Sequence, residues 1–342
     1  MFTPSTSWSE RIPEGEAELH EKLAGRIHAL QRDRAARAPL GRGLHYHSHG
    51  GVRAELSVLP DLPEWARVGI FAEAGRYEAL VRFSSGSGVK QPDPTPDVRG
   101  MAVKVLGVPG KKLIPGLESA TTQDFLCILT NTMPVANAEK FVGLVMAASG
   151  PPILALPRFI GLFGLFGFIP TLKRLQAGLK RPVPSLTEMT WHTPVPIRWG
   201  DTAVKYRFIP VSSQAPTALV PKDSPERLHL DLAARLSAAP VVFELQIQGF
   251  VDEARTPIED PTVAWDDALS PPLAVARLTL PAQDLSSPEG RARHDAIEKL
   301  SFDPWHAPEA FRPLGDMMRA RAPTYRESVM ERKASPEPER MI

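Results

Sequence analysis

The sequence predicts an α+β fold with an antiparallel β-barrel core, an N-terminal helix and C-terminal helices. Short runs rich in valine, leucine, isoleucine and phenylalanine recur between residues 80 and 280, and clusters of proline, glycine and aspartate separate them. No regular helical pattern lies between each pair of runs, which favours antiparallel strands over parallel ones. Thirty-six prolines among 342 residues exclude long continuous helices throughout the chain, because an interior proline removes a helical hydrogen bond.

The chain is expected to divide into three parts. Residues 1–39 should hold a loose polar arm and then a helix, because leucine and isoleucine recur at helical spacing before Pro39. Residues 40–333 should form one domain, which ends in a helix-compatible stretch from residue 308. Residues 334–342 are rich in proline and charge and are expected to be disordered. The strands of the domain are expected at residues 80–85, 100–107, 124–130, 204–211, 241–250 and 273–280.

Composition argues against several classes of protein. Forty basic against 39 acidic side chains give a formal charge of +1, so no concentrated basic surface for nucleic acid is expected. The single cysteine, Cys127, excludes an internal disulfide and a cysteine-rich zinc or iron–sulfur site. The first 18 residues show no secretory signal, and together these features predict a cytoplasmic protein.

The segment 141–172 is unusually apolar. Its first 17 residues carry no charge, and several phenylalanines follow. Prolines interrupt the first run and the second is short, so a membrane-spanning helix, which needs about 20 apolar residues, is not expected. A buried hairpin is favoured. An apolar flap that touches a lipid surface or lines a greasy entrance remains open.

Arg321, Tyr325 and Arg332 share one face if their segment is helical. An adjacent guanidinium favours the phenolate form of a tyrosine, and tyrosine is a known axial ligand of haem iron. The second arginine could pair with a carboxylate such as a haem propionate. On spacing alone, a surface helix with a packed tyrosine is the more ordinary interpretation.

His45, His47 and His49 would point to the same side of an extended strand, which suggests a metal site. No downstream cluster of carboxylates or histidines completes such a site, so a single functional histidine with two solvated neighbours is favoured. Histidine is also the natural proton shuttle near neutral pH. The segment 80–107 is expected to be a hairpin with a long loop, and its glycines do not support a dinucleotide site.

The chain resembles the haem catalase family in motifs that occur in the same order. They read RGLH (42–45), VRFS (81–84), DVRGMAVKV (97–105), NTMP (131–134), and RAPTY (321–325) followed by an arginine at 332. The resemblance runs from about residue 40 to residue 333. It is nearest to the short bacterial catalase-like haem proteins, or mini-catalases, although the apolar segment 141–172 looks unusual for the family.

This resemblance implies a barrel that binds haem b, the ferric iron protoporphyrin. Tyr325 would bind the iron and Arg321 would hold the phenol deprotonated. His45 would serve as general base and then acid, Ser84 would fix its ring, and Asn131 would orient the peroxide. The haem propionates would be held by Arg42, Arg82 and Arg332.

Three functions stay open on this basis. The first is cleavage of hydrogen peroxide or organic peroxides, with catalase or peroxidase output. The second is conversion of fatty-acid hydroperoxides, as in catalase-like allene oxide synthases, with a peripheral membrane contact through residues 141–172. The third is haem binding without turnover. The family also implies a homo-oligomer.

Overall fold

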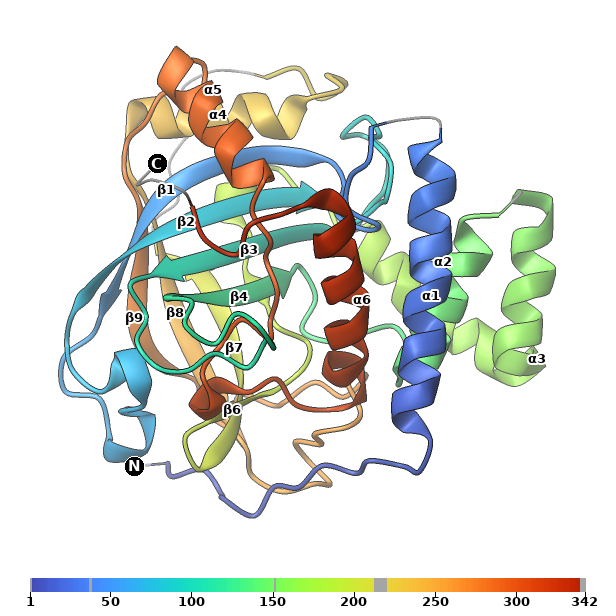
Figure 1. Ribbon diagram of the computed structural model, residues 1–342, viewed down its shortest axis with the longest axis horizontal. Helices are drawn as coiled ribbons and strands as arrows, with labels where there is room; N and C mark the ends of the chain where they lie inside the picture. Colours follow the sequence, from blue (N-terminus) through green and yellow to red (C-terminus); the bar gives the residue numbers. More distant parts are fainter. Residues whose placement is uncertain (1, 37–38, 151, 212–219, 339–342) are drawn as a thin grey trace.

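The computed structural model describes residues 2–36, 39–150, 152–211 and 220–338. Within these residues the chain folds into a closed antiparallel β-barrel with helices packed around it (Figure 1). The strands are β1 (Ser48–Val58), β2 (Arg76–Ser85), β3 (Arg99–Leu106), β4 (Thr122–Ile128), β5 (Trp191–His192), β6 (Ile197–Trp199), β7 (Thr202–Pro210), β8 (Val241–Gly249) and β9 (Leu273–Leu280). The α-helices are α1 (Glu16–Ala35), α2 (Ala138–Ala148), α3 (Pro152–Leu179), α4 (Arg227–Ala238), α5 (Pro288–Glu298) and α6 (Asp316–Arg332).

Hydrogen bonding places the strands in the order β5-β4-β3-β2-β1-β9-β8-β7-β6. The short strand β5 closes the barrel, because Ile128 of β4 pairs with His192 while Trp191 pairs with Phe208 of β7. Eight of the described strands therefore form the barrel, and β6 extends β7 at the rim. Along β8, buried and partly exposed residues alternate, so one face of each strand fills the interior. The predicted fold class is confirmed.

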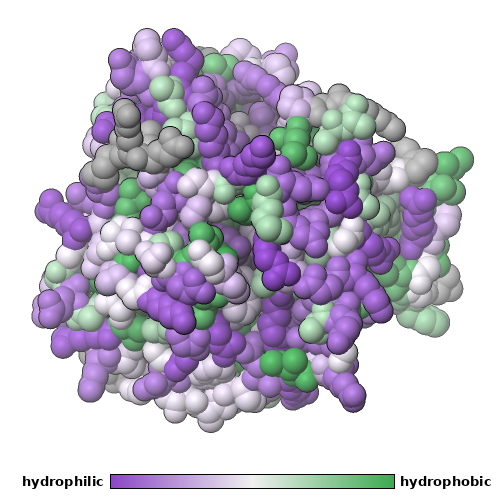
Figure 2. Space-filling view, viewed as in Figure 1, coloured by the Kyte–Doolittle hydropathy of each residue, from purple (hydrophilic) through white to green (hydrophobic). Residues whose placement is uncertain are grey.

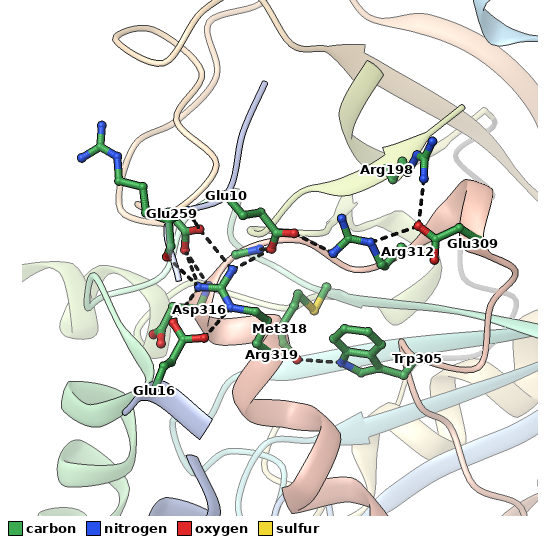
Figure 3. A network of polar contacts seen from close by, with 12 residues as sticks. Glu10, Glu16, Arg198, Glu259, Trp305, Glu309, Arg312, Asp316, Met318 and Arg319 are labelled. Atoms are coloured by element: carbon green, nitrogen blue, oxygen red, sulfur yellow. Dashed lines mark hydrogen bonds and ion pairs between the residues drawn. The ribbon is translucent and has the colours of Figure 1, made fainter. Parts of the chain in front are cut away.

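One side of the barrel is covered by α6, and α1 packs against α6 (Figure 1). A network of ion pairs fastens the start of α6 to the N-terminal arm (Figure 3). Arg319 lies 2.6 Å from a Glu10 oxygen, 2.7 Å from Glu16 and 3.1 Å from Glu259. The arm was predicted to be loose. That prediction is wrong, because the buried Glu10 carboxylate of the arm pairs with Arg319 of α6.

The beginning of the predicted disordered tail is also bound. The backbone N–H of Ser301 donates to the carbonyl of Ser335 at 2.7 Å, and the N–H of Thr121 donates to the Glu337 carboxylate. Residues 334–338 thus differ from the prediction because they pair with the segment that follows α5. The rest of the predicted tail, 339–342, lies outside the described residues.

Within the apolar segment, residues 141–148 lie in α2 and residues 152–172 lie in α3, and the two helices project beside α1 (Figure 1). Phe166 is 93% exposed and Ile153 is 84% exposed, and hydrophobic surface appears along the edge that α3 forms (Figure 2). The favoured buried hairpin is therefore wrong, because the segment forms a helical projection that is kinked at Gly164. Among the described helices, none alone is long and apolar enough to cross a membrane; the bent pair 156–164 and 166–179 passes that test only together.

Candidate active site

A cavity lies between the barrel wall, α2 and α6. The barrel side contributes His45 and Ser84, and α6 contributes Arg321 and Tyr325. Its apolar wall includes Phe141 of α2, together with side chains of β3 and β4. Of the predicted site residues, those that line this cavity are Arg42, His45, Arg82, Ser84, Arg321, Tyr325 and Arg332. Segments that are far apart in the sequence thus meet around one space.

His45 lies three residues before the start of β1 and lines the cavity. Its φ of 55° takes it out of the extended conformation, so it does not continue the alternation of the strand that follows. Its Nδ1 contacts Ser84 Oγ at 3.0 Å, which fixes the ring. Gly100 on β3 makes room for this ring, because a Cβ at Gly100 would lie 2.6 Å from His45 Cε1. The predicted contact between His45 and Ser84 is present.

The His45 imidazole is neutral at neutral pH. Burial, with smaller contributions from Arg82 and Arg321, lowers the pKa of His45 to about 3. A neutral ring can accept a proton. Because Nδ1 is engaged with Ser84, Nε2 is the nitrogen that can take a proton from a molecule in the cavity. His45 therefore has the state that a general base requires.

Tyr325 and Arg321 lie one turn apart on α6. Burial raises the pKa of Tyr325, and the charge of Arg321 only partly opposes this effect. Without a bound cation the phenol is therefore neutral, and the expected role of Arg321 in holding an iron-bound phenolate deprotonated stays a prediction. Ionisation needs a further positive charge, and a metal cation bound to the oxygen would supply it.

The three predicted carboxylate-binding arginines gather around Glu298, at the end of α5. Arg82 Nε donates to Glu298 Oε1 at 2.5 Å, and Arg42 Nη1 donates to Oε2 at 3.0 Å. Burial by itself would raise the pKa of Glu298, but the charges of Arg82 and Arg42 lower it to about 2. Arg332 interacts electrostatically with Glu298, and its buried Nε has no hydrogen-bond partner within the described part of the chain.

This cluster carries an excess of positive charge beside the cavity. Three guanidinium groups face one carboxylate, and guanidinium groups keep their charge in proteins at neutral pH. Burial together with the charge of Arg82 lowers the pKa of Arg332 to about 10, which still leaves Arg332 charged. A buried excess of two positive charges favours binding of an anion with two negative charges. α5 can approach β1 here because Gly51 has no side chain; a Cβ there would lie 2.9 Å from the Cβ of Ile297.

Asn131 is not where the resemblance places it. The residue is exposed and is not among those that line the cavity. In the loop after β4 the buried side chains include Leu129, Met133 and Val135, and this packing leaves Asn131 on the outer surface. Asn137, the other nearby amide, caps α2 by accepting from the N–H of Lys140 at 3.0 Å. The expected amide beside His45 is therefore not found in the cavity.

Comparison with solved structures identifies the architecture. A fungal catalase matches with a TM-score of 0.67 over 97% of this chain, at 16% identity, and a bacterial catalase matches with a TM-score of 0.65 over 100%, at 15% identity. The chain spans 65% and 66% of the lengths of those two proteins. No protein-family model and no curated protein matches the sequence. The barrel, its covering helices and these matches agree, and the chain has the fold of the catalases.

Proposed function

We propose that this protein is a haem-dependent oxidoreductase that cleaves hydrogen peroxide or organic peroxides, similar to the short bacterial catalase-like proteins. The observation that carries the proposal is that the Tyr325 phenol and the neutral His45 imidazole line one cavity. The catalase fold supports peroxide chemistry at a coarse level. The particular residues in the cavity support the finer assignment.

The residues of the cavity fit a ferric haem b. The Tyr325 oxygen is a suitable iron ligand, and the apolar wall formed by Phe141 and its neighbours suits a porphyrin face. The unpaired Nε of Arg332 and the excess of two positive charges suit a pair of propionate groups. Arg42, Arg82 and Arg332 would hold these groups. When bound, haem would supply the iron at which the oxygen–oxygen bond is cleaved.

The chain's own groups then move the proton. His45 Nε2 would accept a proton from the peroxide and return it to the departing oxygen, and the low pKa keeps this nitrogen available beforehand. Ser84 keeps the ring oriented through its contact with Nδ1. Asn131 does not line this cavity, and the side-chain amide in its described lining is that of Gln31 on α1.

The test is an absorption spectrum of the purified protein after reconstitution with hemin, followed by addition of hydrogen peroxide with oxygen detection. We expect one haem per chain, a spectrum typical of tyrosinate ligation, and peroxide loss. A folded protein that leaves hemin unbound contradicts the proposal. Tight haem binding with no peroxide loss would instead assign the chain as a haem-binding protein without turnover.

A second candidate function is conversion of fatty-acid hydroperoxides. The exposed apolar residues of α3 favour it, because α3 packs on α2 and α2 lines the cavity through Phe141 and Val142. We propose that α3 contacts a lipid surface from which such a substrate could enter. Consumption of a fatty-acid hydroperoxide without oxygen release, together with co-sedimentation with anionic lipid vesicles, would favour this function over the first.

Assembly and location follow the same reasoning. We propose a homo-oligomer, which the likeness to catalases supports. We also propose a cytoplasmic location, because the buried Cys127 forms no disulfide. Sedimentation velocity tests the first proposal, and cell fractionation tests the second. A monomer at micromolar concentration would contradict the proposed assembly.

A further inference from the structure

A second group of polar side chains lies where β1 begins: His47, His49 and Asp93. Each offers one possible metal-ligand atom, and these atoms all lie within 4.8 Å of one another. The three residues are 8%, 0% and 5% exposed. Successive residues of a strand point to opposite faces, so Ser84 contacts His45 in the cavity while its neighbour Ser85 contacts His49. The group is thus distinct from the proposed haem site.

The atoms that face one another in this group lack partners. His47 Nδ1, His49 Nδ1 and Asp93 Oδ1 are buried, and none has a hydrogen-bond partner within the described part of the chain. His49 Nδ1 lies 3.4 Å from Asp93 Oδ1. Each unpaired buried polar atom costs about 1–3 kcal/mol. Three such atoms around one point indicate that a binding partner belongs between them.

The separation suits a tetrahedral metal ion. Bonds of about 2.0–2.1 Å to nitrogen and oxygen place tetrahedral ligand atoms about 3.3 Å apart, close to the distance between His49 and Asp93. Imidazole nitrogen and carboxylate oxygen are both ordinary ligands of Zn²⁺. The two histidines and the carboxylate supply three ligands and leave a fourth position for water.

Contacts behind the group hold its ligand atoms in place. His49 Nε2 lies 2.8 Å from Ser85 Oγ, which selects the ring orientation that turns Nδ1 toward Asp93. Asp93 Oδ2 accepts from the N–H of Leu228 at 2.7 Å, at the start of α4. The carbonyl of Asp93 accepts from Arg99 at 2.8 Å. Such outer contacts are typical of metal sites, because they orient the ligands before the ion binds.

A second group of possible metal ligands differs from this one, because its side chains already pair with one another and with neighbouring residues. Glu16, His20 and Asp316 also lie close together. There, however, His20 Nε2 contacts Asp316 Oδ1 at 2.8 Å, and Glu16 places both carboxylate oxygens on Arg319. Asp316 Oδ2 accepts from the N–H of Ala138 at 2.6 Å. Among the described residues, no buried side-chain nitrogen or oxygen of this second group lacks a hydrogen-bond partner, so the group serves as a control.

We propose that His47, His49 and Asp93 bind a divalent transition-metal ion, Zn²⁺, with water at the fourth position. The ion would join the start of β1 to the loop before β3 and, through Asp93, to α4. It would thereby fix the strand that follows His45 without taking part in peroxide chemistry. The sequence favoured two solvated histidines beside a functional one. That expectation is wrong for His47 and His49, because both are buried, and His45 leaves the extended conformation that would align it with them.

The test uses the full chain, stripped with a chelator and then dialysed. Titration with Zn²⁺, followed by elemental analysis after gel filtration, should show one ion per chain, and the melting temperature should rise. Co²⁺ should give the intense visible bands of a four-coordinate ion. Asp93→Asn and His47→Gln should each weaken Zn²⁺ binding by at least about tenfold. His20→Gln, in the control group, should bind like the unaltered protein.

Circular dichroism at room temperature shows whether each variant is folded. Because His47 lies at the edge of the group, His47→Gln keeps the test available if Asp93→Asn does not fold. The proposal is overturned if the stripped protein binds no Zn²⁺, or if folded His47→Gln binds it unchanged. Tighter binding of Fe²⁺ than of Zn²⁺ under anaerobic conditions would overturn the choice of metal. Haem content, measured in the same samples, reports separately on the proposed function.

Discussion

Replacing Glu298 by glutamine should destabilise the haem-free protein by about 3 kcal/mol at neutral pH. The pKa of this carboxyl group is 4.5 in the unfolded chain and about 2 in the folded protein, and each pKa unit corresponds to about 1.4 kcal/mol. The side chain is 27% exposed, so solvent screening makes this figure an upper value. Glutamine keeps the shape but leaves Arg42 and Arg82 without their common counter-charge.

The pH dependence gives the prediction a sign. Because the folded-state pKa of Glu298 lies below its unfolded value, the folded protein holds the ionised form more strongly than the unfolded chain does. The stabilisation is complete above about pH 4.5, falls to about half near pH 3, and is lost as the pH falls through about 2. The difference between the two proteins should shrink over this range.

Urea denaturation followed by circular dichroism measures this difference at each pH. Glu309→Gln is the matched control, because Glu309 also pairs with two arginines but its side chain is 56% exposed. The control should change the free energy of unfolding by less than about 1 kcal/mol. Equal losses in the two variants, or a Glu298→Gln effect that stays constant into acid, would refute the electrostatic reasoning.

The other predictions concern the cavity. Tyr325→Phe removes the proposed iron ligand and should change the absorption spectrum after reconstitution; an unchanged spectrum would show that another group binds the iron. His45→Ala should retain haem but slow peroxide cleavage by about 10²–10⁴-fold in stopped flow, and a normal rate would remove His45 from the reaction. Because the pKa of His45 is about 3, the rate for the unaltered protein should be flat from about pH 5 to about pH 8, whereas a step near pH 6.5 would indicate an ordinary histidine. Gly100→Ala adds a Cβ that would lie 2.6 Å from His45 Cε1. The variant should lose about 1–3 kcal/mol in its free energy of unfolding, measured in urea, and should cleave peroxide more slowly. A variant that is equally stable and fully active would contradict the predicted crowding. Asn131→Ala should alter neither haem binding nor the rate of peroxide cleavage, because Asn131 is exposed. A slower rate would show that the Asn131 amide acts in the cavity.

The barrel was predictable because its strands carry a local signal. The runs chosen from their apolar and β-branched residues correspond to β2, β3, β4, β7, β8 and β9, with ends that differ by a few residues. The helix α5 was missed because it is polar and buries only Gly290 and Ile297. Its start carried a usable signal: Ser287 caps the helix by accepting from the N–H of Gly290, and Pro288 occupies the first turn.

The site residues differ in the same way: those in continuous sequence motifs could be predicted, and those that meet only in the folded chain could not. Residues that belong to continuous motifs, such as Arg42 with His45, were found from the sequence and line the cavity. Glu298 was not found, since it meets Arg82 across 216 positions and no local spacing connects the two. Asp93 was not found either, because the sequence of the loop between β2 and β3 is typical of an ordinary turn and no local spacing connects Asp93 with His47 and His49. Asn131 shows the opposite error, in which a motif matched while the packing of its loop turned the side chain outward.

The fastening of α6 by Arg319 has a consequence for how the molecule is made. Arg319 meets Glu16 across 303 positions and Glu10 across 309, so these two carboxylates are translated long before their common partner. At roughly 5–20 residues per second, this delay is on the order of 15–60 seconds. The helix that carries Tyr325 can dock only after this interval, so we expect porphyrin to be loaded only after α6 has been translated.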